Sequence, residues 1–126
     1  MISNPYIRVA KAGAENPKWI KATFPARGSW RSVCYGNGKF VAVDEWYSKV
    51  AYSADGITWS QATLPSSLSW SSVCYGNGKF VAVAESSATA AYSADGITWS
   101  QATLPGSLSW YSVCYGNGKF VAVAES

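Results

Sequence analysis

The chain has 126 residues, of which 48% are hydrophobic, 15% aromatic and 13% charged, and its formal net charge is +3. The length suits one folded domain, and the composition excludes a disordered chain. Histidine is absent, which excludes Ser-His-Asp and Cys-His catalytic groups and histidine-based metal sites. No apolar run reaches the roughly 20 residues of a membrane-spanning helix, so we expect no membrane insertion.

The chain begins "MISNPYIRVAKAG", which lacks the apolar stretch of a secretory signal. We therefore expect a protein that is cytosolic when made, or one whose leader has been removed. Six of the ten Lys and Arg residues lie within positions 1–31. They do not have the density of a nucleic-acid-binding stripe, and no recognition-helix pattern accompanies them. The sequence therefore predicts no nucleic-acid partner.

A repeat of 40 residues organises the rest of the chain. Trp30, Trp70 and Trp110 are spaced 40 apart, and 32 of the 40 positions in 30–69 are identical in 70–109. A third, shorter unit, 110–125, differs from the second only at Tyr111. Such a period is typical of a propeller or a solenoid.

Each unit contains four segments with the pattern of short strands. "WSSVCYG" alternates polar and apolar residues and leads into Asn-Gly, the preferred two-residue hairpin turn. "KFVAVAE" is a dense β-branched run, "TAAYSA" leads into a second turn at Asp-Gly, and "ITWSQATL" ends at proline. The sequence predicts an all-β fold. Four antiparallel strands in about 40 residues match one blade of a β-propeller, and a β-solenoid is the alternative.

The stretch "YSADGITW", at 52–59 and 92–99, resembles the Asp-box of BNR or sialidase-like β-propellers, although it is one residue shorter between Asp and Gly. In that motif Ser, Asp, Gly, Thr and Trp shape the turn between the third and fourth strands of a blade. "GNGKFVAV…AYSADGITW" is also similar to repeats in propellers of phage tail and surface-associated proteins. The resemblance implies a virion-tail or extracellular-surface location. The residues that match the motif are Ser53, Asp55, Gly56, Thr58, Trp59, Ser93, Asp95, Gly96, Thr98 and Trp99.

The chemistry of these residues favours a structural role over a catalytic one. An Asp side chain in such a turn accepts hydrogen bonds from nearby backbone N–H groups. Gly tolerates positive φ, and Trp covers the turn with a large apolar face. We therefore interpret Asp55 and Asp95 as turn residues rather than catalytic carboxylates.

The N-terminal segment is predicted to be an eroded half of the same unit. Counting back 40 from Trp59 and Pro65 leads to Trp19 and Pro25. Gly13, Glu15 and Lys18 replace the Ser, Asp and Thr of the box. The whole chain, 1–126, is then one propeller segment. Its parts are a half-blade of outer strands at 6–25, blades at 30–65 and 70–105, and a half-blade of inner strands at 110–125.

Together these parts make three four-stranded antiparallel blades per chain, whereas closed propellers usually have about four to eight. An open chain would expose unpaired strand edges at 6–25 and 119–125. We expect the ring to close by homo-oligomerisation, with the N-terminal half-blade of one chain completing the C-terminal half-blade of another. Two chains would give a homodimer with six blades, and three chains would give nine.

The sequence predicts no enzyme, metal site or cofactor. Cys34, Cys74 and Cys114 occupy equivalent positions without a Cys-x-x-Cys pair, so we expect small buried apolar residues. Sialidase-like catalysis would need an arginine cluster and a Tyr–Glu pair, but the three arginines all lie near one end of the chain. Asp44 and Glu45 are adjacent in a strand, so they should point to opposite faces.

The differences between repeats suggest a ligand-binding side. The eight differences between 30–69 and 70–109, and Tyr111, all fall near second-to-third-strand or unit-to-unit connections, whereas the "YGNGK" and "SADGIT" turns are unchanged. Aromatic rings mixed with polar groups suit a glycan or surface receptor, so we predict a non-catalytic binding module. Loop drift, a purely structural or assembly propeller, and an engineered or recently amplified repeat are the alternatives. The candidate ligand-binding residues are Arg31, Asp44, Trp46, Tyr47, Lys49 and Tyr111.

Overall fold

The computed structural model describes residues 2–13, 15, 18–24, 28–46 and 48–125, with the backbone alone at 2–6 and 24. Strands dominate the described ranges and no helix occurs in them, which confirms the predicted all-β class. No helix there is long and apolar enough to cross a membrane.

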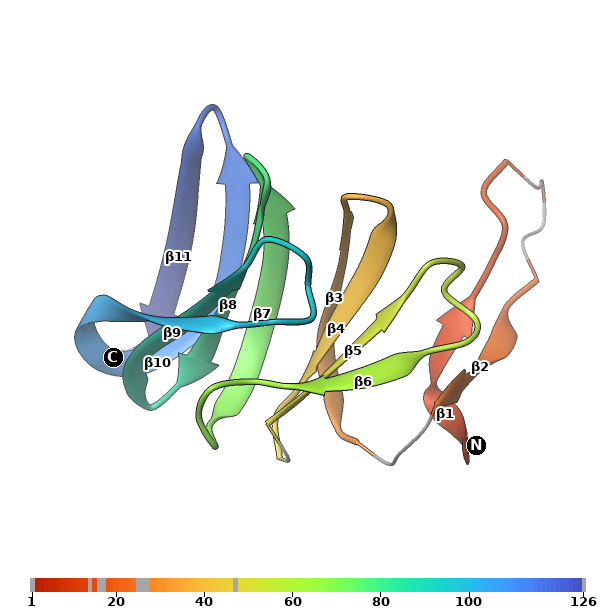
Figure 1. Ribbon diagram of the computed structural model, residues 1–126, viewed down its shortest axis with the longest axis horizontal. Coiled ribbons are helices and arrows are strands. Elements are labelled where there is room, and N and C mark those ends of the chain that lie inside the picture. Colours follow the sequence, from red (N-terminus) through yellow and green to blue (C-terminus); the bar gives the residue numbers. More distant parts are fainter. Residues whose placement is uncertain (1, 14, 16–17, 25–27, 47, 126) are drawn as a thin grey trace.

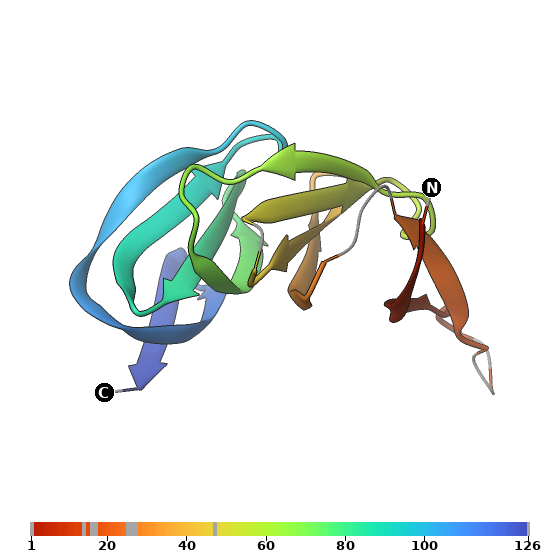
Figure 2. The ribbon, with the colours of Figure 1, turned by 90° about the horizontal axis from the view of Figure 1, so that it is seen from below.

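The described strands form three antiparallel sheets that lie side by side, with the two terminal hairpins at opposite ends of the molecule (Figures 1 and 2). The first sheet pairs β1 (Ile2–Val9) with β2 (Ile20–Phe24). The second sheet has the order β3-β4-β5-β6 and the third has the order β11-β10-β9-β8-β7. The second sheet consists of β3 (Trp30–Gly36), β4 (Lys39–Asp44), β5 (Lys49–Ser53) and β6 (Ser60–Thr63). The third consists of β7 (Ser69–Gly76), β8 (Lys79–Glu85), β9 (Ser87–Ser93), β10 (Ser100–Gly116) and β11 (Lys119–Glu125).

The third sheet curls into a half-barrel because β10 is a single strand of 17 residues. Its first part pairs with β9 through Ser100 to Thr103, and its second part pairs with β11 through Ser109 to Gly116. The sequence predicts a blade at 70–105 and a half-blade at 110–125, and in the structure β10 belongs to both segments because it pairs with β9 and with β11.

The first unit does not form such a long strand, and the chain that follows β6 makes two hydrogen bonds to Ser48. After β6, Leu64 N donates to Ser48 O at 2.9 Å, and Leu68 N donates to Ser48 Oγ at 3.2 Å. The first bond extends the pairing of β5 with β6 by one residue, and the second holds Leu68 beside the residue that precedes β5. The second unit has Ala88 in place of Ser48 and Gly106 in place of Ser66. In the second unit Leu108 pairs with Ser87, and the corresponding segment is part of β10.

The predicted Asn-Gly hairpin turns are present in all three units. Asn37 and Gly38 have φ of 48° and 77°, and the corresponding residues at 77–78 and 117–118 have nearly the same values. Positive φ at both central residues is the requirement of a two-residue turn that matches the twist of the flanking strands. The preceding glycine of each "YGNG", at 36, 76 and 116, is not among the residues with positive φ.

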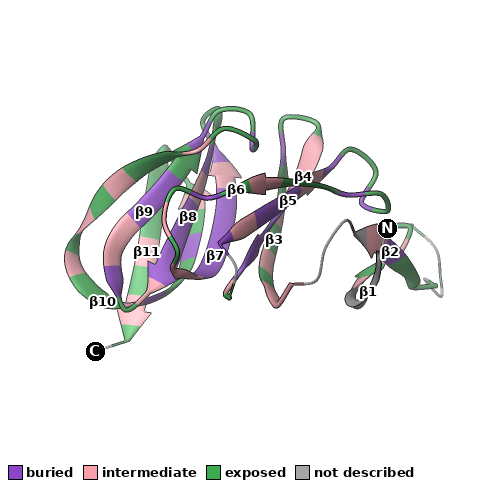
Figure 3. Cartoon of the chain, turned by 60° about the horizontal axis from the view of Figure 1, so that its bottom comes forward, coloured by how far each residue is buried: buried purple, intermediate pink, exposed green. Residues whose placement is uncertain are grey.

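The main core lies between the second and third sheets, where most of the purple colour of Figure 3 is concentrated. Along "KFVAV" the side chains alternate, so Val41 and Val43 face the third sheet while Phe40 and Ala42 face β1 and β2. Trp70 and Phe80 of the third sheet are fully buried against the two valines. Burying each of these large side chains stabilises the fold by about 1.5–3 kcal/mol.

The hairpin turns and the variable connections lie on opposite edges of the molecule. In Figure 1 the β3–β4, β5–β6, β7–β8 and β10–β11 turns are at the upper edge. The β4–β5, β6–β7 and β8–β9 connections are at the lower edge. The differences between the repeats therefore cluster along the lower edge.

Candidate functional site

The two Asp-Gly turns have the same hydrogen-bond network. In the β5–β6 turn, Asp55 Oδ1 accepts from Ile57 N at 2.8 Å and from Thr58 N at 3.0 Å. Ser53 Oγ accepts from Gly56 N at 2.8 Å and donates to Thr58 O at 2.7 Å. The Trp59 indole donates to Gly56 O at 2.7 Å. Each polar group therefore holds the turn itself.

The β9–β10 turn repeats this arrangement. Asp95 Oδ1 accepts from Ile97 N and Thr98 N, both at 2.8 Å, and Ser93 Oγ accepts from Gly96 N at 2.8 Å. Backbone hydrogen bonds from Thr98 and Ile97 lower the pKa of Asp95, and those from Ile57 and Thr58 lower the pKa of Asp55. The hydrogen bonds of each turn therefore favour the ionised carboxylate, as expected of a residue that holds its own turn.

These pKa shifts predict acid sensitivity of the fold. Because the folded pKa of each carboxylate lies below its unfolded value, their contribution is present at neutral pH and is lost as the pH falls below the ordinary Asp pKa of about 3.9. We expect the double variant Asp55→Asn and Asp95→Asn to melt several degrees lower at pH 7 and to lose little more on acidification to pH 3. Calorimetry of both proteins across this range is the check. Parallel pH dependences for the variant and the parent would contradict the assignment.

On the lower edge, Asp44 at the end of β4 is fully buried. Its Oδ2 accepts from Ser29 N at 2.8 Å, and its Oδ1 accepts from Trp46 N at 3.1 Å. A buried carboxylate is stable only when such donors surround it. Asp44, one of the candidate ligand-binding residues, therefore holds the backbone just before β3 and just after β4.

Arg31, at the start of β3, joins two sheets. Its Nη1 contacts Glu45 Oε2, and its Nη2 lies 3.1 Å from Glu85 Oε1 on β8. The hydrogen bonds from Ser29 and Arg31 lower the pKa of Glu45, and the two glutamates raise the pKa of Arg31. All three side chains are partly exposed, so this network adds little stability, about 1 kcal/mol or less for an exposed pair.

The remaining candidate residues differ in their exposure. The Trp46 side chain is 70% exposed in the β4–β5 connection, and Tyr111 is exposed on β10 in another sheet. Lys49 is half-buried at the start of β5, and Tyr47 lies outside the described residues. The structure thus brings Arg31, Asp44 and Trp46 to one part of the lower edge, while Tyr111 belongs to a different sheet.

A second candidate site is the face of β3 and β4 that is turned toward the N-terminal hairpin. We call this face the leading face, and its residues are Trp30, Val33, Tyr35 and Phe40. The same positions in the next unit, Trp70, Val73, Tyr75 and Phe80, pack into the core between the second and third sheets. Val33 is 59% exposed, whereas Val73 is 4% and Val113 is 7% exposed. The leading face therefore has an apolar surface whose equivalents inside the molecule are covered.

The opposite end of the molecule also exposes apolar residues whose equivalents inside the molecule are buried. We call the outer surface of the β10–β11 hairpin, with Cys114, Val121 and Val123, the trailing face. Val121 and Val123 are 54% and 46% exposed, whereas their equivalents Val41 and Val43 are fully buried. Cys114 is likewise exposed, while Cys74 is buried and Cys34 is intermediate.

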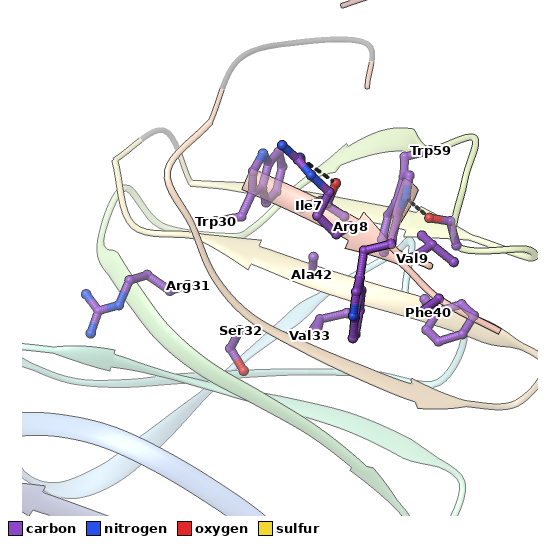
Figure 4. Close-up of a pocket in the computed structure, with 13 residues that line it drawn as sticks. Ile7, Arg8, Val9, Trp30, Arg31, Ser32, Val33, Phe40, Ala42 and Trp59 are labelled. Carbon is purple, nitrogen blue, oxygen red and sulfur yellow. Dashed lines mark hydrogen bonds between the residues drawn. The ribbon is translucent and has the colours of Figure 1, made fainter. Parts of the chain in front are cut away.

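A cavity of about 440 Å³ lies over the leading face. Ile7, Val9 and Trp19 line it from the N-terminal segment, and Trp30, Val33 and Phe40 line it from the second sheet (Figure 4). The N-terminal hairpin covers the outer part of the same face of the second sheet, where Ala22 packs with Trp59 in a small core. The inner part, next to β3, remains open to solvent.

Two of the three thiols, those of Cys34 and Cys74, have pKa values that burial raises. Burial raises the pKa of Cys34 to about 12 and that of Cys74 to about 11, which suppresses the nucleophilic thiolate. All three cysteines are free. In the ranges that the structure covers, no three His, Cys, Asp or Glu residues gather where a metal ion could bind.

No model of a known protein family matches the chain, and no curated protein shows significant similarity to it. The leading and trailing faces are the part of the site that sequence patterns did not reveal. The repetition itself is the signal that could have revealed these faces. Residues that are identical in the three units have a neighbouring unit on each side only in the middle of the chain, so at each end one face lacks its neighbour.

Proposed function

We propose that the chain is a non-catalytic β-propeller segment that completes its ring with a second copy of itself. Its four-stranded second sheet is one blade, and β7, β8, β9 and the first part of β10 form another. The second part of β10 with β11 supplies inner strands, and β1 with β2 supplies outer strands. The absence of histidine and the protonated state of the buried thiols support a binding or assembly role rather than catalysis.

The observation that carries this proposal is the pair of uncovered apolar faces. Inside the chain, the surface equivalent to the trailing face, with Val41 and Val43, packs on the surface equivalent to the leading face, with Trp70 and Phe80. At the two ends, Val33 and Tyr35 of the leading face and Val121 and Val123 of the trailing face are about half exposed. Placing the trailing face of one copy on the leading face of another repeats a contact that the chain already makes.

The strand edges support the same arrangement. β11 is an edge of the third sheet, and β1 has β2 as its partner strand, while Thr23 of β2 also forms a bridge with Thr58. If β11 of one copy pairs with β1 of another, as β4 pairs with β5, one complete four-stranded blade results. The junction would remove two exposed edges, which otherwise promote disordered association. Two chains joined at two such junctions give a homodimer with six blades, and three chains would give nine.

A second candidate function, recognition of a glycan or surface receptor by the lower edge, is favoured by Trp46. An indole that is 70% exposed in a connection that varies between repeats is available to stack on the apolar face of a sugar. Arg31 and Lys49 lie nearby in the sequence of the same unit, and Tyr111 would contribute from another sheet. Without such a ligand, the protein is a purely structural propeller.

Trp46→Ala is expected to weaken binding of the parent protein's best glycan-array hits about tenfold or more while leaving the melting temperature unchanged, because the ring makes no core contact. Tyr92→Ala is the matched control, since Tyr92 is another exposed aromatic residue and precedes the β9–β10 turn, whose sequence does not vary between the repeats. An array without any hit for the parent protein, or equal loss in both variants, would favour the purely structural function.

A further inference from the structure

The contact between successive units depends on a glycine that a tyrosine ring covers. A Cβ atom built on Gly36 would lie 2.0 Å from Cγ of Tyr75, and one built on Gly76 would lie 1.9 Å from Cγ of Tyr115. Such distances exclude any side chain. Because these glycines have no positive φ, the close approach of the ring, rather than the backbone conformation, requires glycine here.

A hydrogen bond accompanies each of these ring contacts. Val73 N donates to Ser32 Oγ at 3.1 Å, and Val113 N donates to Ser72 Oγ at 3.1 Å. Each bond links one unit to the next, as each tyrosine does. Both contacts fix the register of one sheet on its neighbour, that is, the position of its strands along the strand direction.

This series of contacts is incomplete at both ends of the chain. Gly116 is exposed, and within the described part of the chain no heavy atom lies within 4 Å of a Cβ built on it. Tyr35 is 57% exposed. Its ring nevertheless lies 4.7 Å from that of Phe40, close to the 4.6 Å of Tyr75–Phe80 and the 4.8 Å of Tyr115–Phe120. Tyr35 is therefore already held in the position that its covered equivalents adopt.

We infer that two copies meet in this same register, with Tyr35 of one copy covering Gly116 of the other. Val33 N of the first copy donates to Ser112 Oγ of the second, as Val73 N donates to Ser32 Oγ within a chain. This inference rests on the proposed function, because it specifies how the leading and trailing faces meet. It also makes the contact head-to-tail: two trailing faces placed together would leave both Gly116 residues without a ring.

Gly116→Val tests the register directly. In a single chain the new side chain enters open space, and valine is well suited to a strand, so the far-ultraviolet circular dichroism spectrum should not change. In the assembly it collides with Tyr35, so we expect the dissociation constant, measured by sedimentation at several concentrations, to rise at least a hundredfold. Gly106→Ser is the matched control, because Ser66 occupies that position in the first unit; it should assemble like the parent.

A double-mutant cycle identifies the residue that the valine meets. Tyr35→Ala weakens assembly but also creates room, so Gly116→Val should cost at least tenfold less in the Tyr35→Ala background than in the parent. Equal cost in both backgrounds, or a parent-like dissociation constant for Gly116→Val, would overturn the register but leave head-to-tail assembly intact. A parent protein that stays a single chain at all concentrations would instead contradict the proposed function itself.

Discussion

Replacing Val121 and Val123 with aspartate is expected to convert the assembled protein into single folded chains. Both side chains are about half exposed in one chain, and the equivalent valines of the second sheet are fully buried between sheets. Burial of a valine side chain contributes about 1.5–3 kcal/mol relative to exposure, and an unpaired carboxylate at a buried position costs several kcal/mol more. The variant should therefore lose assembly completely while it keeps its circular dichroism spectrum.

Ile97→Asp is the control for this variant. Ile97 is 37% exposed in the β9–β10 turn, so a carboxylate there remains in water. Sedimentation of the three proteins at the same concentration provides the comparison. Assembly of the Val121→Asp, Val123→Asp variant to the same mass as the parent would show that the trailing face is not the contact surface.

Removing residues 1–25 is expected to produce aggregated or unfolded protein rather than a well-behaved single chain. The deletion takes away β1 and β2 and with them Ala22, so Trp59 and Ala42 lose the cover that buries them. It also leaves β11 of the second copy without the strand that completes its sheet. Exposed edges and apolar faces of this kind promote non-specific association.

Adding a copy of residues 86–105 after Glu125 of the shortened chain should restore assembly. The added segment supplies the third and fourth strands of the C-terminal blade, in place of β1 and β2 of the other copy. The number of strands in the ring is therefore the same as in the parent. A soluble parent-like assembly is therefore expected from the rearranged chain, measured by its mass and melting curve. Soluble single chains from the shortened protein without the addition would contradict the role assigned to β1 and β2.

The strands and hairpin turns could be predicted from the sequence because each depends on local rules. Asn37 and Gly38 adopt the positive φ of a two-residue hairpin turn, and "KFVAV" alternates between two buried surfaces as its pattern indicates. The Asp55 turn likewise forms within a few residues. The continuity of β10 was not predictable from such rules, because the strand continues through a register shift between Thr103 and Leu108 in its pairing with β9.

The candidate site was less accessible to sequence reasoning, since exposure depends on distant parts of the chain. Asp44 is a charged residue in a variable stretch, which favours a ligand-binding interpretation, yet Ser29 N and Trp46 N bury its carboxylate. Gly36, the first glycine of "YGNG", has the pattern of a turn residue, but in the structure the ring of Tyr75 packs directly on it. That contact joins residues about 40 positions apart and has no local signature.

The mass of the 126-residue chain in dilute solution tests most directly whether the two apolar faces join copies of the protein. Light scattering coupled to size-exclusion chromatography should give twice the 13.5 kDa of one chain, with no aggregate. Three times that mass would replace the six-bladed ring with a nine-bladed one. A mass of 13.5 kDa that persists on concentration would contradict the completion of the propeller by a second copy.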